Sequence, residues 1–328
     1  MKWKHHLLSR ESLEDKFIGS AIGTFVGDTL GMPVEGWGRA AIEARFGLLT
    51  TLEDGRFPRG YYTDDTEMMI GILEVLAENG DFDPNLTVKK FLENFHPERG
   101  YGGRIYVLMD RLRKGIPWHQ VATDSFGNGA AMRIAPIGFF YFHDIKNVKR
   151  YAILSCKITH LHPEAIAGAV AQAIAVSLAV SYGIRNIPIP RIEFLDRIME
   201  EVLDIHTGFV QRILEIKSIS KLGLRDNIQN IARCFACHVR SIEAVPPAIA
   251  SFLLTDTFKD AVVTGINLGG DTDTIGAMTG AIAGAYYGYS QIPEEWIQVL
   301  ENASKGRDYV IGLAKKAAEI LYRRLKKS

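Results

Sequence analysis

Two short acidic segments, both close to glycines, are the parts of this sequence best suited to chemistry. The first is Thr63-Asp64-Asp65-Thr66-Glu67, and the second is Gly269-Gly270-Asp271-Thr272-Asp273-Thr274. Each precedes an apolar stretch with helical spacing, where Asp and Thr are common helix caps. Because the two segments are so alike, we predict that they are the two halves of one polyanionic site rather than two unrelated helix caps. Like charges about 4 Å apart repel by about 4 kcal/mol at an effective dielectric constant of about 20, so such a site requires cations.

The residue types in the clusters indicate which cations these are. Neither cluster contains His or Cys, so every side-chain ligand would be a hard oxygen, and such ligands favour Mg²⁺ or Mn²⁺ over Zn²⁺. Asp271 and Asp273 would diverge by about 200° on a helix but point the same way on an extended chain. The preceding glycine pair permits the turn that an extended loop requires. We therefore predict two divalent ions held by both clusters, in preference to helix capping alone.

Two glycine-rich helices are expected to bring these clusters together. A glycine occupies every fourth position in two apolar segments: Gly19, Gly23, Gly27 and Gly31, then Gly276, Gly280, Gly284 and Gly288. This spacing leaves a bare stripe on one helix face, and close packing must offset the ~1 kcal/mol that each interior glycine costs. A membrane helix dimer is the alternative, which Asp28, Asp271 and Asp273 at the segment ends disfavour. We predict two central helices in contact through glycine, with Asp28 and Glu35 beside the second cluster.

Helical spacing dominates the rest of the sequence, and alternating strand patterns are scarce. Further helices are expected over residues 67–79, 88–94, 102–114, 130–142, 148–159, 164–182, 192–216, 228–239, 248–255, 258–268, 294–304 and 307–326. Breaks are expected at residues 115–117, at residues 187–190 and at Pro246-Pro247. The prediction is an all-α, many-helix protein with a central metal cleft. Because its two acidic clusters must meet, we expect one domain over residues 1–328.

Composition argues against several classes of protein. The 328 residues carry 38 basic and 38 acidic side chains, so no excess of positive charge indicates a general nucleic-acid partner. Three cysteines are too few for a disulfide framework, which favours a cytoplasmic location. The first six residues lack the apolar core of a signal peptide. Residues 164–182 form the only membrane-like run, and Glu164 and Gln172 within it favour a buried helix and no membrane partner.

Five motifs occur in a fixed order over residues 17–296. They are Gly27-Asp28-Thr29-Leu30-Gly31-Met32-Pro33-Val34-Glu35, Tyr62-Thr63-Asp64-Asp65-Thr66, Gly127-Asn128-Gly129-Ala130-Ala131-Met132-Arg133, Thr159-His160-Leu161-His162-Pro163 and Gly270-Asp271-Thr272-Asp273-Thr274. Together they resemble the ADP-ribosylglycohydrolase family. The resemblance implies an all-α domain with two Mg²⁺ or Mn²⁺ ions in a central cleft. It maps the metal ligands onto six positions, Thr63, Asp64, Asp65, Asp271, Asp273 and Thr274.

The same resemblance implies a substrate site in the segment 125–130. Its residues are Ser125, Phe126, Gly127, Asn128, Gly129 and Ala130. The two glycines enter a predicted helix, where bare N–H groups can cradle phosphate; an ordinary turn is the alternative for this motif alone. By resemblance the loop holds the diphosphate of ADP-ribose, and His160 contacts the same ligand. Glu35 matches a mobile acidic residue of the family, so Glu35 and Asp65 are the expected catalytic residues, and residues 101–104 are a candidate rim of the cleft.

These assignments predict an enzyme, a hydrolase acting on an N- or O-glycosidic bond. It would release ADP-ribose from an ADP-ribosylated protein or a small ADP-ribosyl compound, as a monomer. A metal-held water would attack the anomeric carbon, and carboxylates would stabilise the oxocarbenium-like transition state. Two alternatives stay open. One is a two-metal pyrophosphohydrolase acting on ADP-ribose. The other is a catalytically silent ADP-ribose-binding relative, against which the complete set of ligand positions counts.

Overall fold

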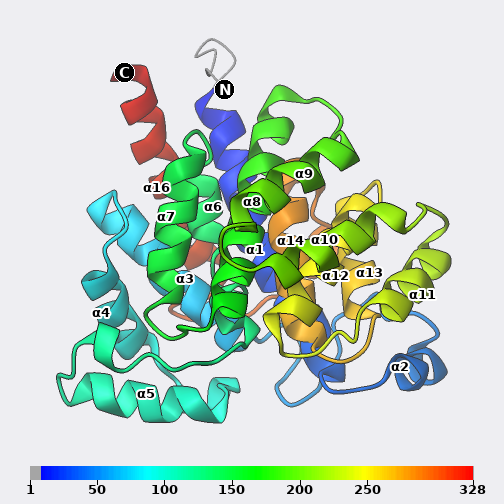
Figure 1. The fold of residues 1–328 in the computed structure, drawn as a ribbon, viewed down its shortest axis with the longest axis horizontal. Coiled ribbons are helices and arrows are strands. Elements are labelled where there is room, and N and C mark those ends of the chain that lie inside the picture. Colours follow the sequence, from blue (N-terminus) through cyan, green and yellow to red (C-terminus); the bar gives the residue numbers. More distant parts are fainter. Residues whose placement is uncertain (1–8, 328) are drawn as a thin grey trace.

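Helices make up the regular structure of residues 9–327, the part of the chain that the computed structural model describes. In chain order they are α1 (Arg10–Gly31), α2 (Arg39–Phe46), α3 (Asp64–Asn79), α4 (Pro84–Asn94), α5 (Gly103–Arg113), α6 (Ala135–Phe140), α7 (Ile145–Cys156), α8 (Pro163–Arg185), α9 (Arg191–Val202), α10 (Thr207–Ser218), α11 (Leu224–Cys234), α12 (Ser241–Leu253), α13 (Phe258–Ile266), α14 (Thr272–Tyr287), α15 (Glu294–Ile297) and α16 (Arg307–Lys327). Short 3₁₀ turns include η2 (Met32–Val34) and η5 (Asn128–Ala130). No β-strand occurs among the described residues. The helices gather around α1, α8 and α14 in one compact domain (Figure 1), which confirms the predicted all-α fold.

The central pair, α1 and α14, touches along the two glycine stripes. A methyl group on Gly23 would lie 2.1 Å from the carbonyl oxygen of Gly280, and one on Gly27 would lie 1.9 Å from that of Gly276. Because the contact moves backward along α14 as it moves forward along α1, the two helices are antiparallel. These distances leave no room for any side chain, so the predicted contact through glycine is confirmed.

The antiparallel arrangement places the end of α1 against the start of α14. A methyl group on Gly31 would lie 2.2 Å from the carbonyl oxygen of Thr272, and the Thr272 hydroxyl donates a hydrogen bond to the carbonyl oxygen of Gly31 at 2.8 Å. Asp28, near the end of α1, and the second acidic cluster, at the start of α14, therefore lie at the same end of the helix pair.

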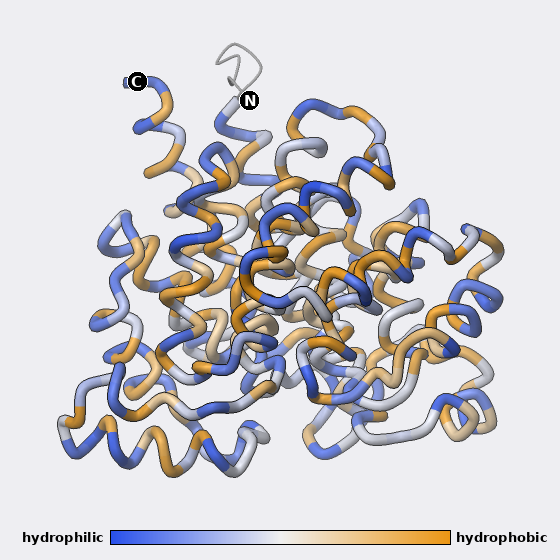
Figure 2. Tube along the Cα trace, in the orientation of Figure 1, coloured by the Kyte–Doolittle hydropathy of each residue, from blue (hydrophilic) through white to orange (hydrophobic). Residues whose placement is uncertain are grey.

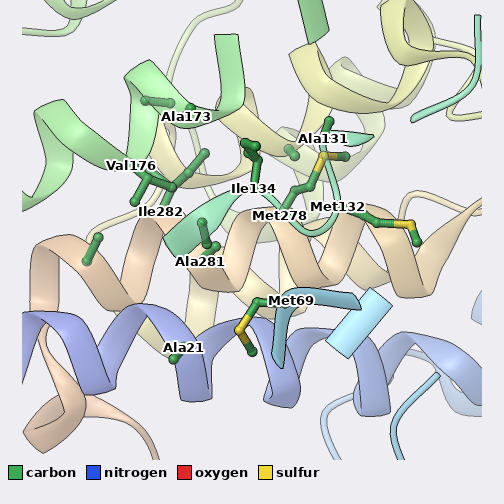
Figure 3. Close-up of a cluster of buried hydrophobic side chains, with 14 of the residues drawn as sticks. Ala21, Met69, Ala131, Met132, Ile134, Ala173, Val176, Met278, Ala281 and Ile282 are labelled. Carbon is green, nitrogen blue, oxygen red and sulfur yellow. The ribbon is translucent and has the colours of Figure 1, made fainter. Parts of the chain in front are cut away.

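The third central helix, α8, packs against α14 in an apolar layer. Figure 3 shows Ala173 and Val176 of α8 beside Ala281 and Ile282 of α14, and Figure 2 shows apolar residues concentrated along these inner helices. Two helical segments have the length and apolarity of a membrane span, residues Arg10–Val34 as well as α8, so α8 is not alone in this respect. Their most apolar windows are 94% and 89% buried, as expected of core helices.

One predicted helix, over residues 192–216, is two helices. α9 ends at Val202 and α10 begins at Thr207. Nδ1 of His206 accepts the N–H of Phe209 at 3.0 Å, which caps α10 and stabilises the break. Apolar spacing continues through both helices, so the periodicity did not reveal the boundary.

Prolines account for two further corrections. The helix predicted over residues 130–142 is divided into η5 and α6, because Pro136 has no N–H with which to continue an upstream helix and instead lies in the first turn of α6. Pro246 and Pro247 were expected to break a helix but are buried inside α12. α12 packs against both α8 and α14. α15 ends at Ile297 rather than at residue 304, and α2 was not anticipated.

Candidate active site

The first acidic cluster is held in place by Asp28, a buried carboxylate near the end of α1. Its Oδ2 accepts the N–H of Thr63 at 3.0 Å, the N–H of Thr66 at 3.2 Å and the hydroxyl of Thr66 at 2.6 Å. α3 begins at Asp64 rather than at residue 67, so Asp64 and Asp65 lie in its first turn. The positive end of the helix dipole therefore faces both carboxylates.

The second acidic cluster is fixed by hydrogen bonds among three loops. Gly270 has a φ of 78°, which favours glycine at this turn. Its N–H donates to the carbonyl oxygen of Trp37 at 2.8 Å, and its carbonyl oxygen accepts the N–H of Gly36 at 2.7 Å. The N–H of Asp271 donates to the carbonyl oxygen of Cys237 at 2.8 Å. The loop that follows η2 is thereby held beside the second cluster.

Asp273 does not lie on extended chain as predicted, because α14 begins before it. Asp271 is the N-cap of α14, with φ −86° and ψ 65°, and Asp273 lies in the first helical turn. Carboxylate oxygens of Glu35, Asp271 and Asp273 nevertheless lie within 4.8 Å of one another. The non-helical backbone of the cap residue is what lets the two aspartates converge. Glu35 also pairs with the guanidinium of Arg56 at 3.0 Å.

Burial raises the pKa of the aspartates in and around both clusters. The pKa of Asp28 rises to about 6, against the effect of the hydrogen bonds that its oxygens accept. Burial, and then the charge of Asp28, raise the pKa of Asp64 and of Asp65 well above the usual value. Burial raises the pKa of Asp271, and burial together with the Asp271 charge raises that of Asp273. Oδ1 of Asp65 is buried and accepts no hydrogen bond from the described residues, so this oxygen is available to a cation.

A cavity of about 290 Å³ joins the two clusters to the 125–130 segment. Eleven of the predicted site residues line it: Glu35, Asp64, Asp65, Ser125, Gly127, Asn128, Gly129, His160, Asp271, Asp273 and Thr274. Gly102, Gly103 and Arg104 of the candidate rim also line the cavity. Three predicted residues lie outside its wall. Thr63 caps α3, Ala130 is buried in a separate apolar cluster, and Phe126 is 41% exposed.

The 125–130 segment offers fewer free N–H groups than predicted. η5 is only three residues long, so no extended helix begins here. The N–H of Gly127 donates to Oγ of Ser125 at 3.2 Å, and the N–H of Asn128 donates to the carbonyl oxygen of Val239 at 2.9 Å. Nδ2 of Asn128 donates to Oδ2 of Asp271 at 2.5 Å. The Asn128 side chain therefore belongs to the acidic cluster. Ser125 Oγ donates no hydrogen bond to the other described residues, so its hydroxyl can donate to a ligand.

His160 lies directly beside the glycines of this segment. A methyl group on Gly127 or on Gly129 would lie 3.5 Å from its Nε2. Burial, and then the charges of Arg133 and Arg104, lower the pKa of His160 to about 3. The imidazole is therefore neutral at physiological pH, and it lies where it can serve as a polar contact for a ligand.

Sequence reasoning assigned no role to several residues that the fold brings to the site. Arg133 and Thr159 stand inside two of the five motifs, so a signal for them existed, and both line the cavity. Arg56 lies in no motif, and only the fold brings it to Glu35. Asp28 was expected at this end of the molecule, but its hydrogen bonds to the start of α3 could not be derived from spacing.

Comparisons with known proteins agree with this fold and identify a family. Residues 9–327 match the family model for ADP-ribosylglycohydrolases. The chain is 33% identical to an uncharacterized protein of Archaeoglobus fulgidus, covering 96% of this chain and 99% of the relative. It is 31% identical to the ADP-ribosylhydrolase ARH3 of Xenopus tropicalis, covering 90% and 93%. It is 29% identical to ARH3 of Homo sapiens, covering 87% and 89%.

A solved structure supports the same assignment at the level of the fold. The structure, described as an ADP-ribosylglycohydrolase-related protein complex, superposes with a TM-score of 0.76 over 94% of this chain and 99% of its own. The two sequences are 24% identical. With the family model matching nearly the whole chain, this protein belongs to the ADP-ribosylglycohydrolase family.

Proposed function

We propose that this protein is a metal-dependent hydrolase that cleaves a glycosidic bond and releases ADP-ribose from a modified protein side chain or a small ADP-ribosyl compound. The observation that carries the proposal is the convergence of both acidic clusters on one cavity, which also contains the neutral His160. Relatives named ADP-ribosylhydrolases support the substrate class.

The two acidic clusters fit a pair of Mg²⁺ or Mn²⁺ ions. Their donor atoms are all oxygens, as these ions prefer. Oxygens of Glu35, Asp271 and Asp273 lie close enough to share a cation, and Oδ1 of Asp65 is buried with no hydrogen bond from the described residues. The residues that would hold the ions are Thr63, Asp64, Asp65, Asp271, Asp273 and Thr274. Bound there, the ions would neutralise the carboxylates and acidify a water molecule.

Glu35 is the carboxylate best placed to move a proton. Its side chain is 36% exposed, whereas Asp271 and Asp273 are buried. An exposed carboxylate can accept a proton inside the cavity and return it to solvent. Asp65 would act at the sugar, where its charge stabilises the positive character of the transition state.

The part of the cavity wall formed by Ser125, Gly129 and His160 would hold the diphosphate. Ser125 and His160 are neutral hydrogen-bonding groups beside Gly129, and none of the three adds negative charge near the phosphates. Phe126 presents an exposed ring on which a base can stack, and the guanidinium carbon of Arg240 lies 5.0 Å from the centre of that ring. With the diphosphate on this wall, the distal ribose faces the carboxylates. The glycosidic bond, rather than the pyrophosphate, is then the bond beside Asp65.

The experiment that tests this proposal combines metal analysis with an activity assay. Activity should vanish in chelator and return with Mg²⁺ or Mn²⁺, and Asp65→Asn and Asp273→Asn should each abolish it. Asp110→Asn is the matched control, because Asp110 is exposed on α5 and pairs only with Lys114 among the described residues. Wild-type protein that is active with no bound divalent ion would overturn the proposal.

A further inference from the structure

A buried chain of hydrogen bonds runs from Arg133 through Thr159 to His160. The Arg133 side chain is fully buried, and its Nη2 donates to Oγ1 of Thr159 at 2.8 Å and to the carbonyl oxygen of Ser155 at 2.9 Å. Oγ1 of Thr159 lies 2.6 Å from Nδ1 of His160. Within residues 9–327 no carboxylate pairs with this guanidinium, which instead lies 5.0 Å from the centre of the Phe91 ring. Burying the Arg133 guanidinium without a pairing carboxylate costs free energy, so we expect its charge to serve the site.

The chemistry of the three groups fixes the direction of the chain. A guanidinium has no acceptor, so Oγ1 of Thr159 must accept from Arg133. A threonine hydroxyl carries one hydrogen, and the only acceptor that it reaches among the described residues is Nδ1 of His160. Nδ1 therefore accepts, and a neutral imidazole whose Nδ1 accepts carries its proton on Nε2.

We propose that Arg133 and Thr159 are positioning residues that hold His160 in the tautomer with its proton on Nε2, so that Nε2 donates a hydrogen bond to the diphosphate of the ligand. Nε2 faces the Gly127 and Gly129 wall of the cavity, where a ligand oxygen can approach. The opposite tautomer would present a lone pair to an anionic oxygen and repel it. The identity of the ligand rests on the proposed function, whereas the tautomer does not.

Arg133 contributes to this site without touching the ligand. Its charge polarises the hydrogen-bonded chain, which strengthens the donor at the far end. Because no carboxylate among the described residues pairs with it, that charge also remains available to attract an anion in the cavity. A direct contact with Arg133 is not needed for either effect, so we class it as a positioning residue rather than a catalytic one.

The tautomer can be measured in the ligand-free protein by ¹⁵N NMR of histidine-labelled samples, with His160 assigned from the signals that disappear in His160→Gln. Wild type should show a protonated Nε2 and an unprotonated Nδ1. Thr159→Val removes the hydroxyl at nearly constant shape and should abolish this preference, whereas Thr159→Ser keeps the hydroxyl and should retain it. A wild-type His160 protonated on Nδ1 would overturn the inference without any variant. So would a Thr159→Val protein that is folded and keeps the wild-type tautomer.

Calorimetry with ADP-ribose then tests what the tautomer does. Thr159→Val should bind ADP-ribose about tenfold more weakly than wild type and Thr159→Ser, because a hydrogen bond to a charged group is lost. Normal binding by a Thr159→Val protein whose tautomer has changed would refute the donor role of Nε2. Failure of wild type to bind ADP-ribose would instead refute the proposed function, while the tautomer result would stand.

Discussion

Replacing a glycine by alanine in the contact between α1 and α14 should lower the stability of the protein, although helix propensity alone predicts a gain. Gly23→Ala would place a methyl group 2.1 Å from the carbonyl oxygen of Gly280 and 2.8 Å from its carbonyl carbon. Both distances are below 3.0 Å, the limit under which Cβ contacts essentially never occur in proteins. The helices must therefore separate locally by about 1 Å. Overpacking costs about 1–3 kcal/mol, and a rigid backbone neighbour places this site near the upper limit. Subtracting the ~1 kcal/mol that Ala contributes to a helix leaves a net loss of about 2 kcal/mol.

Urea unfolding of matched variants measures this effect. Gly312→Ala makes the same chemical change in α16, where nothing lies within 4 Å of the added methyl group. It should gain up to about 1 kcal/mol in the free energy of unfolding, so the two variants should differ by about 3 kcal/mol. Equal stability of the two variants, or a Gly23→Ala protein at least as stable as wild type, would refute the reasoning about the glycine contact.

Three further predictions concern the site. Gly31→Ala would place a methyl group 2.2 Å from the carbonyl oxygen of Thr272, the residue between Asp271 and Asp273 in the sequence. The variant should therefore bind Mn²⁺ more weakly than wild type in calorimetry. Unchanged affinity would mean that the cluster tolerates the displacement. Burial raises the folded-state pKa of the carboxyl groups around Asp65 above the unfolded value, so the metal-free protein loses stability as pH rises through the folded-state pKa values. Because bound ions need the deprotonated form, the rise in Tm caused by Mn²⁺ should grow between pH 5 and pH 8, and a constant rise would contradict this. Glu35→Gln should lower kcat sharply with little change in ADP-ribose affinity, since proton transfer acts in the transition state; wild-type turnover would remove Glu35 from the mechanism.

Features that depend on local chemical rules could be predicted from the sequence. The likeness of the two acidic segments predicted that the clusters at Asp65 and Asp271 would meet, and the cavity has both in its wall. Four-residue glycine spacing predicted the contact between α1 and α14, because no other residue permits such an approach. Both arguments need only residue types and their positions.

Features that depend on the backbone conformation of a single residue or on distant partners could not be predicted. Asp271 and Asp273 converge because the cap residue leaves helical geometry, whereas spacing alone suggested an extended chain. The Asn128 side chain contacts Asp271, 143 positions away, and no property of the 125–130 segment indicates that contact. Thr159 and Arg133 were visible as motif residues, but the direction of their hydrogen bonds required measured distances.

The most direct test of the central claim is the identity of the product. Purified protein should be incubated with Arg-linked, Ser-linked and base-linked ADP-ribosyl substrates in Mg²⁺ or Mn²⁺, and the products analysed by mass spectrometry. We predict intact ADP-ribose together with the unmodified acceptor from at least one substrate, and neither product in chelator. Release of AMP, with a phosphoribosyl group left on the acceptor or freed as ribose 5-phosphate, would show pyrophosphate cleavage and contradict the account.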